Sequence, residues 1–152
     1  LYFHTGITAH FSEMGHRYLS SSFMHPVTLD AIAPHFPGLN IVMAHTGNPW
    51  LDEAAMLLRI HSNLYSDLTG STLKYRSPVR LREVLWWQPG VAYGDKQNRD
   101  AFEKIVFGSD LHYNDYDDIL RDYQNVMDEL ALPENIRTAI WGGTISQLLE
   151  KL

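Results

Sequence analysis

The chain has 152 residues, of which 45% are hydrophobic, and this is enough apolar material to bury one core. Its formal net charge is −6 and its 12 Lys and Arg residues form no run, so we expect no nucleic-acid partner. No apolar stretch approaches the roughly 20 residues that cross a bilayer, and cysteine is absent; we therefore expect a cytoplasmic protein with no membrane partner.

Strands and helices are predicted to alternate along the chain. Apolar runs typical of buried parallel strands lie at residues 1–5, 40–45, 64–69 and 105–107. Helical periodicity is found in residues 26–36, 51–61, 79–87, 117–130, 133–141 and 145–152. Residues 71–78 and 88–99 have the composition of loops. Each strand is thus followed by a helix, an order that requires a parallel sheet with right-handed crossovers.

Three of these helices have a clear apolar stripe that we expect to face the core. The stripes consist of Leu51, Ala54, Ala55 and Leu58; of Ile119, Leu120, Tyr123, Val126, Met127 and Leu130; and of Ile145, Leu148, Leu149 and Leu152. Four strands are too few to close a barrel, so the sheet is either open and doubly wound or part of a larger barrel. Because the chain opens directly on an apolar strand at Leu1, we expect a fragment of a longer polypeptide.

Three short cassettes lie at the C-terminal ends of apolar runs: His4-Thr5-Gly6, Ala44-His45-Thr46-Gly47 and Phe107-Gly108-Ser109-Asp110. A parallel α/β barrel collects the residues at the C-terminal ends of its strands into one cleft, however distant they are in sequence. Two imidazoles and a carboxylate are ligands that a divalent ion such as zinc accepts. The competing interpretations are that the histidines are hydrogen-bonded structural residues and that Asp110 caps the next helix.

Other side chains have weaker claims to a functional role. Trp50 and His112 follow the cassettes closely enough to bind a substrate, although large aromatic residues usually supply packing area. We expect His10 and His16 to be exposed in the loop after the first strand. The remaining histidines, His25, His35 and His61, lie at predicted helix ends, where imidazolium suits the helix dipole.

Several motifs in the same order carry a family resemblance. They are Leu29-Asp30-Ala31-Ile32-Ala33, Phe36-Pro37, the run from Ile41 to Gly47, the run from Asn63 to Gly70, and Val106-Phe107-Gly108-Ser109-Asp110. With these motifs the chain resembles the amidohydrolase-related proteins, metal-dependent hydrolases of (β/α)8 TIM-barrel fold that also include nonoxidative decarboxylases of aromatic acids. The resemblance implies that residues 1–152 form one α/β unit, the second half of that barrel, with strands five to eight.

The resemblance also implies roles for the cassette residues. His4 would bind the metal, His45 would act in catalysis by polarising the substrate or the metal-bound water, and Asp110 would both bind the metal and handle the proton. The ion implied is divalent, with Zn²⁺ as the first choice. The family's first-strand motif of two histidines one residue apart has no counterpart, because the chain contains no His-x-His, and its usual Asn-Ala is Gly143-Thr144 here.

The function implied by the resemblance is hydrolysis of a small carbonyl or carboxylate compound by a metal-activated water. Two alternatives stay open: a nonoxidative decarboxylase, and a noncatalytic half-barrel that lacks a complete metal site. The expected partners are a small-molecule substrate and either a missing N-terminal barrel half or a partner chain, in a homo-oligomer.

Overall fold

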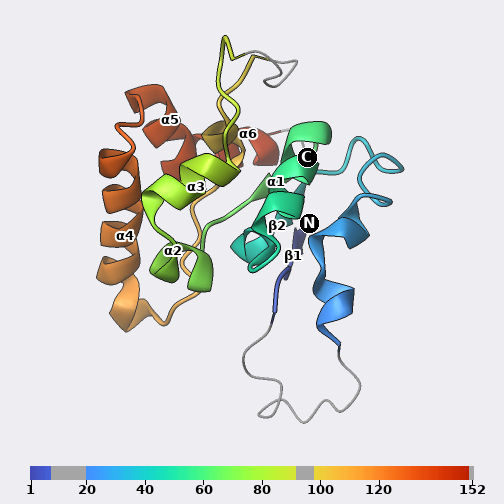
Figure 1. Cartoon of the computed structure of the whole chain (residues 1–152), viewed down its shortest axis with the longest axis horizontal. Coiled ribbons are helices and arrows are strands. Elements are labelled where there is room, and N and C mark those ends of the chain that lie inside the picture. Colours follow the sequence, from blue (N-terminus) through green and yellow to red (C-terminus); the bar gives the residue numbers. More distant parts are fainter. Residues whose placement is uncertain (8–19, 92–97, 151–152) are drawn as a thin grey trace.

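A parallel sheet of three strands forms the centre of the computed structural model, which describes residues 1–7, 20–91 and 98–150 (Figure 1). The strands are β1 (Tyr2–Phe3), β2 (Ile41–Met43) and β3 (Leu64–Ser66), and they lie side by side in sequence order. Tyr2 is in register with Val42, and Ile41 with Leu64. The predicted α/β class with a parallel sheet is therefore confirmed, whereas three described strands do not test the predicted eight-stranded barrel.

The fourth predicted strand, residues 105–107, is reduced to a single parallel bridge between Ser66 and Ile105. The N–H of Val106 donates to the carbonyl of Ser66 at 2.8 Å, and this bond extends the sheet by one residue. The N–H of Phe107 instead donates to the carbonyl of Ile140 at 3.0 Å. The chain leaves the sheet at Phe107 because its backbone bonds there to the C-terminal helical region.

Helices surround the sheet (Figure 1). They are α1 (Leu51–Ile60), α2 (Ser71–Tyr75), α3 (Pro78–Val84), α4 (Tyr116–Glu129), α5 (Glu134–Thr138) and α6 (Thr144–Leu149), with a π-helical turn at Ala139–Gly143. Short 3₁₀ turns lie at Ser21–Met24, Pro26–Leu29, Ala44–Gly47, Ala101–Lys104 and Tyr113–Asp115. Helix α1 packs on β3 and on the turn after β2, and α4 lies on the opposite flank of the molecule from the Ser21–Met24 turn (Figure 1).

The two segments with the clearest helical periodicity, residues 51–61 and 117–130, correspond to the two longest helices, α1 and α4. All four predicted inner residues of α1 are at most 4% exposed, and in α4 Ile119, Tyr123, Val126 and Met127 are buried. The stripe predicted for α6 is wrong at Leu149, which is 60% exposed, while Leu148 is buried. Leu149 is about 100° around the helix axis from Leu148 and lies on the exposed side of this short helix. Leu152 lies outside the described residues.

Three other helix and loop predictions are corrected. Residues 26–36 form a 3₁₀ turn and further turns instead of an α-helix, since Pro34 has no N–H to continue the ladder. Residues 71–75 form α2 instead of a loop, because the N–H of Leu73 donates to the carbonyl of Leu68 at 2.7 Å and starts a helical turn. Gly142 and Gly143 do not end the helix before them, since the π-helical turn carries the chain into α6.

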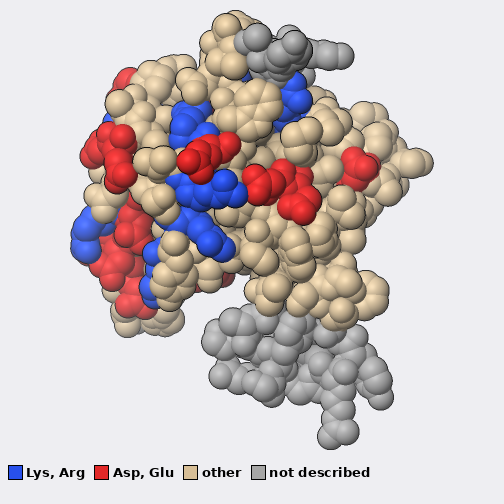
Figure 2. All heavy atoms as spheres, in the orientation of Figure 1, with Lys and Arg blue, Asp and Glu red and all other residues tan. Residues whose placement is uncertain are grey.

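The surface differs from one part of the molecule to another. Acidic side chains gather along α4 (Figure 2). In contrast, Leu1 and the two residues of β1 are apolar and exposed: Leu1 is 63% exposed, Tyr2 58% and Phe3 37%. Strand β1 is the edge of the sheet in the described residues, so its outer side has no neighbouring strand there. None of the described helices is long and apolar enough to span a membrane.

Candidate functional site

His4, His45 and Asp110 lie together at the C-terminal edge of the sheet, as the sequence predicted. His45 Nε2 is 3.2 Å from His4 Nδ1, and the two rings meet edge to face with centroids 4.9 Å apart. On the other side of the ring, His45 Nδ1 is 3.9 Å from Asp110 Oδ2. His4 and Asp110, which are more than 100 positions apart in sequence, therefore both lie next to the His45 imidazole. The roles assigned to them stay predictions.

The backbone that carries His45 is strained and tightly held. His45 and the next residue, Thr46, have φ values of 62° and 48°, in the left-handed region that costs a non-glycine residue about 1–3 kcal/mol. Hydrogen bonds hold this conformation: the N–H of His45 donates to Asp67 Oδ1 at 3.0 Å, and the Thr46 hydroxyl donates to the Asp67 carbonyl at 2.6 Å. The hydroxyl of Thr72 also donates to the carbonyl of His45. Strain maintained in this way is typical of functional sites.

The Thr-Gly pair after His4 joins β1 to the turn after β2. Buried Thr5 donates from Oγ1 to the carbonyl of Ala44 and accepts the N–H of Gly47 at 3.1 Å. Gly6 has φ +104°, and a Cβ there would lie 2.4 Å from the carbonyl oxygen of Asn48. The cassette sequence therefore has a structural reason, because it fixes the end of the His4 strand against the segment that carries His45.

Asp67 and Thr69 belong to the site, although sequence reasoning assigned them no role. Asp67 is fully buried, and its Oδ1 accepts the N–H of Thr69 at 2.7 Å and the Thr69 hydroxyl at 2.5 Å. Its Oδ2 accepts the hydroxyl of Tyr2. Thr69 Oγ1 lies 2.8 Å from His45 Nδ1. The available signal was a carboxylate directly after the buried run of β3, which is the position that the three cassettes share.

The electrostatics of the site favour a neutral imidazole at His4 and a neutral phenol at Tyr2. Burial lowers the pKa of His4 from its ordinary value of 6.5, and repulsion from His45 lowers it further, while Asp110 and Asp67 act in the opposite direction. Burial and the Asp67 carboxylate raise the pKa of Tyr2, so its phenol stays protonated and remains a hydrogen-bond donor. A neutral imidazole at His4 keeps a nitrogen lone pair for a proton or an ion.

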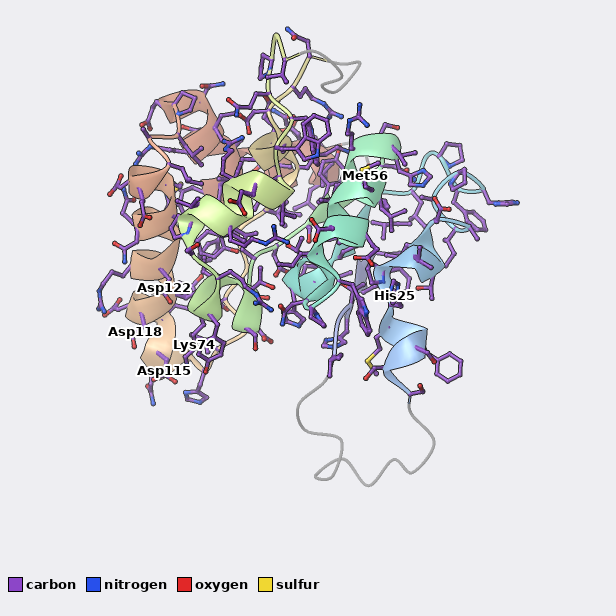
Figure 3. The ribbon with its side chains drawn as sticks, in the orientation of Figure 1. His25, Met56, Lys74, Asp115, Asp118 and Asp122 are labelled. Atoms are coloured by element: carbon purple, nitrogen blue, oxygen red, sulfur yellow. The ribbon has the colours of Figure 1, made fainter. Side chains whose placement is uncertain are left out.

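A cavity of about 720 Å³ extends from the site between α2 and α4. Gly70 and Asp110 line it at the site, and Lys74 on α2 lies across it from Asp118 and Asp122 on α4 (Figure 3). A Cβ on Gly70 would be 3.1 Å from His45 Nδ1, so the glycine leaves the space in which the imidazole and the cavity meet. A volume of this size suits a small-molecule ligand.

The two residues predicted to bind substrate, Trp50 and His112, have contacts within the fold. Trp50 packs on His25 with ring centroids 4.4 Å apart at the start of α1. His112 accepts the N–H of Asn114 at 3.5 Å, and its carbonyl accepts the N–H of Asp115 at 2.9 Å, so it begins the turn before α4. Neither residue lines the cavity beside Asp110. A substrate role for them stays a prediction that these contacts do not support.

The other histidines of the described residues bind near the ends of helices or turns. His25, His35 and His61 contact the Val27 N–H at 3.2 Å, the Ala31 carbonyl at 2.7 Å and the Asp30 carboxylate at 2.7 Å, respectively. The contacts of His25 and His35 are local in sequence, whereas that of His61 joins the end of α1 to the turn at Asp30. His10 and His16 lie outside the described residues.

The side chains fit a divalent ion by their chemistry but not by their number. Imidazole and carboxylate groups are the ligands that zinc takes, and a zinc site needs at least three protein ligands. Across residues 1–7, 20–91 and 98–150, no group of three or more His, Cys, Asp or Glu side chains is arranged to hold a metal ion.

The comparison with protein families gives one clear result. The family model described as Amidohydrolase matches residues 1–150, almost the whole chain. No curated protein and no solved structure matches the chain.

Proposed function

This chain belongs to the amidohydrolase family, and from that premise we propose that it is the second half of a (β/α)8 barrel enzyme, with strands five to eight. Two observations support the proposal. The strands are parallel and adjacent in sequence order, which is the order in such a barrel. The outer side of β1 has exposed apolar residues, and an unpaired strand edge of this kind is normally covered by another strand.

We further propose that the enzyme is a metal-dependent hydrolase of a small carbonyl or carboxylate compound. The observation that carries the proposal is that two side chains lie against the His45 imidazole, His4 at 3.2 Å and Asp110 at 3.9 Å. His4 and Asp110 would contribute ligands to a divalent ion, with Zn²⁺ as the first choice. The further ligands would come from the N-terminal barrel half or from a partner chain. Such an ion would supply an activated water and polarise the substrate carbonyl.

His45 and Asp110 would be the catalytic residues that this chain contributes. The His45 ring is held on a rigid turn, so it can meet a developing negative charge or a proton without reorganising. The Asp110 carboxylate is exposed at the cavity, where it can accept a proton and return it to the leaving group. The substrate would lie in the cavity between α2 and α4, since Asp110 lines that cavity.

A noncatalytic half-barrel is the second candidate. The observation that favours it is the lack of any group of three metal-binding side chains in the parts of the chain that the structure describes. In that case the contacts around His45 would only stabilise the strand ends. Decarboxylation of an aromatic acid would use the same residues as hydrolysis, with Asp110 delivering its proton to carbon, so we treat it as an outcome of the test.

The test is turnover by the natural polypeptide that contains this chain, supplied with Zn²⁺ and assayed on small amides, esters and aromatic carboxylic acids. The variant His45→Gln should lower kcat about 10²- to 10⁴-fold, because a positioned acid–base group contributes that much. His35→Gln is the control, since His35 is an exposed residue that contacts the Ala31 carbonyl. Hydrolysis products would support the first proposal, and CO₂ release would replace it with decarboxylation. Equal turnover in the two variants, or none with any substrate or ion, would favour the noncatalytic half-barrel.

A further inference from the structure

The proton of the Thr69 hydroxyl can be placed from its two neighbours. Thr69 Oγ1 is 2.5 Å from Asp67 Oδ1 and 2.8 Å from His45 Nδ1. An ionised carboxylate only accepts hydrogen bonds, so two oxygens this close need the hydroxyl proton between them. A hydroxyl has one proton, and it is used on Asp67. Thr69 Oγ1 must therefore accept its second hydrogen bond, and the donor is His45 Nδ1.

This bond fixes which ring nitrogen of His45 carries the proton. With the proton on Nδ1, the neutral ring has its lone pair on Nε2, the nitrogen that lies 3.2 Å from His4 Nδ1. The His4 Nδ1–H then donates to His45 Nε2. The hydrogen bonds run in one direction from exposed His4, through His45 and Thr69, to buried Asp67.

The buried end of this series of hydrogen bonds is the Asp67 carboxylate, whose hydrogen-bond donors in the described part of the chain are neutral groups. Asp67 accepts hydrogen bonds from the backbone N–H groups of His45 and Thr69 and from the hydroxyls of Thr69 and Tyr2, and all four donors are neutral. Its side chain is fully buried, so water screens it weakly.

We propose that Asp67 and Thr69 are positioning residues for His45, which hold its imidazole in one orientation with the proton on Nδ1 and the lone pair on Nε2. The proposal rests on the proposed function, because the proposed function is what gives His45 a catalytic role. It adds that the His45 Nδ1–H is committed to Thr69, so that Nε2 is the ring nitrogen that faces His4.

The test is the tautomer of His45, measured by ¹H–¹⁵N NMR correlations on the full protein with ¹⁵N-labelled histidine at a pH where the ring is neutral. The wild type should show a protonated Nδ1 and an unprotonated Nε2. Thr69→Val removes the acceptor and should shift the ring toward the Nε2–H form, whereas Thr69→Ser keeps a hydroxyl and should restore the wild-type pattern. Thr28→Val is the matched control, because the Thr28 hydroxyl donates to the nearby carbonyl of His25 and takes no part in the contacts of His45.

Turnover gives an independent reading. Thr69→Val should lower kcat about 10- to 100-fold, as loss of a supporting hydrogen bond to a functional histidine typically does, with KM within about twofold of the wild type. Thr69→Ser should recover most of that loss. The proposal is overturned if neutral His45 carries its proton on Nε2 in the wild type, or if Thr69→Val leaves the tautomer unchanged. The NMR result does not require turnover, so it separates failure of this proposal from failure of the proposed hydrolase.

Discussion

The two ends of the sheet each bury one charged side chain, and they satisfy it differently. Asp67, at the C-terminal edge, uses side chains that lead outward to His45 and His4. Lys104, 1% exposed, donates from Nζ to the backbone carbonyls of His61, Ser62 and Leu64 at 2.9, 2.8 and 2.8 Å and lies over the Tyr65 ring. A buried charge bound to backbone supports the fold. A buried charge bound to side chains that reach a cavity can also support chemistry.

Loss of the buried lysine should produce the largest change in stability. Lys104→Met removes the ammonium from three carbonyls, and unsatisfied buried acceptors cost about 1–3 kcal/mol each. We expect the free energy of unfolding to fall by about 3 kcal/mol, measured by urea denaturation. Lys74→Met, at an exposed position, is the control and should change it by less than about 0.5 kcal/mol. Equal stability of the two variants would contradict a structural role for Lys104.

The substitution Gly70→Ala should disturb the candidate site at the C-terminal edge of the sheet. Gly70 has φ +63°, and a Cβ there would lie 3.1 Å from His45 Nδ1 and 3.5 Å from Asp110 Oδ2. We expect Gly70→Ala to cost about 1–3 kcal/mol through the backbone and to lower turnover as well, because the imidazole must move. Gly38→Ala serves as the control, since nothing lies within 4 Å of its Cβ position. Unchanged turnover in Gly70→Ala would show that the imidazole position is not critical.

The smallest expected effect is on the pH dependence of stability. Burial and His45 lower the pKa of His4 below 6.5, so the unfolded chain binds a proton at a higher pH than the folded chain does. Stability from this group is complete above pH 6.5 and is lost as pH falls through the lower pKa of the folded state. Urea midpoints measured between pH 7.5 and 5 should therefore fall less steeply in His4→Gln than in the wild type. A steeper fall in the variant would contradict the lowered pKa.

Much of the fold and the grouping of the site could be predicted from sequence. Periodicity placed α1 and α4, because a helix that covers a core must repeat its apolar residues on one face. The rule that parallel strands end at one edge brought His4, His45 and Asp110 together. Both predictions depend on patterns that are local or fixed by topology.

The features that sequence missed depend on individual contacts. Helix α2 forms because Leu73 bonds to Leu68, and the fourth strand ends because Phe107 bonds to Ile140. Asp67 could be seen at a strand end, but its role depends on distances of 2.5 and 2.8 Å through the Thr69 hydroxyl. No pattern in the sequence specifies such distances.

The most direct test of the difference between the two ends is kcat of Asp67→Asn and Lys104→Met, measured on the full protein with the unfolded fraction taken into account. Asp67→Asn removes the buried charge behind His45, and we predict that its kcat falls at least tenfold below that of Lys104→Met, although Lys104→Met is the less stable protein. Equal kcat values per folded molecule would contradict the account, since the C-terminal edge would then support the fold and nothing more.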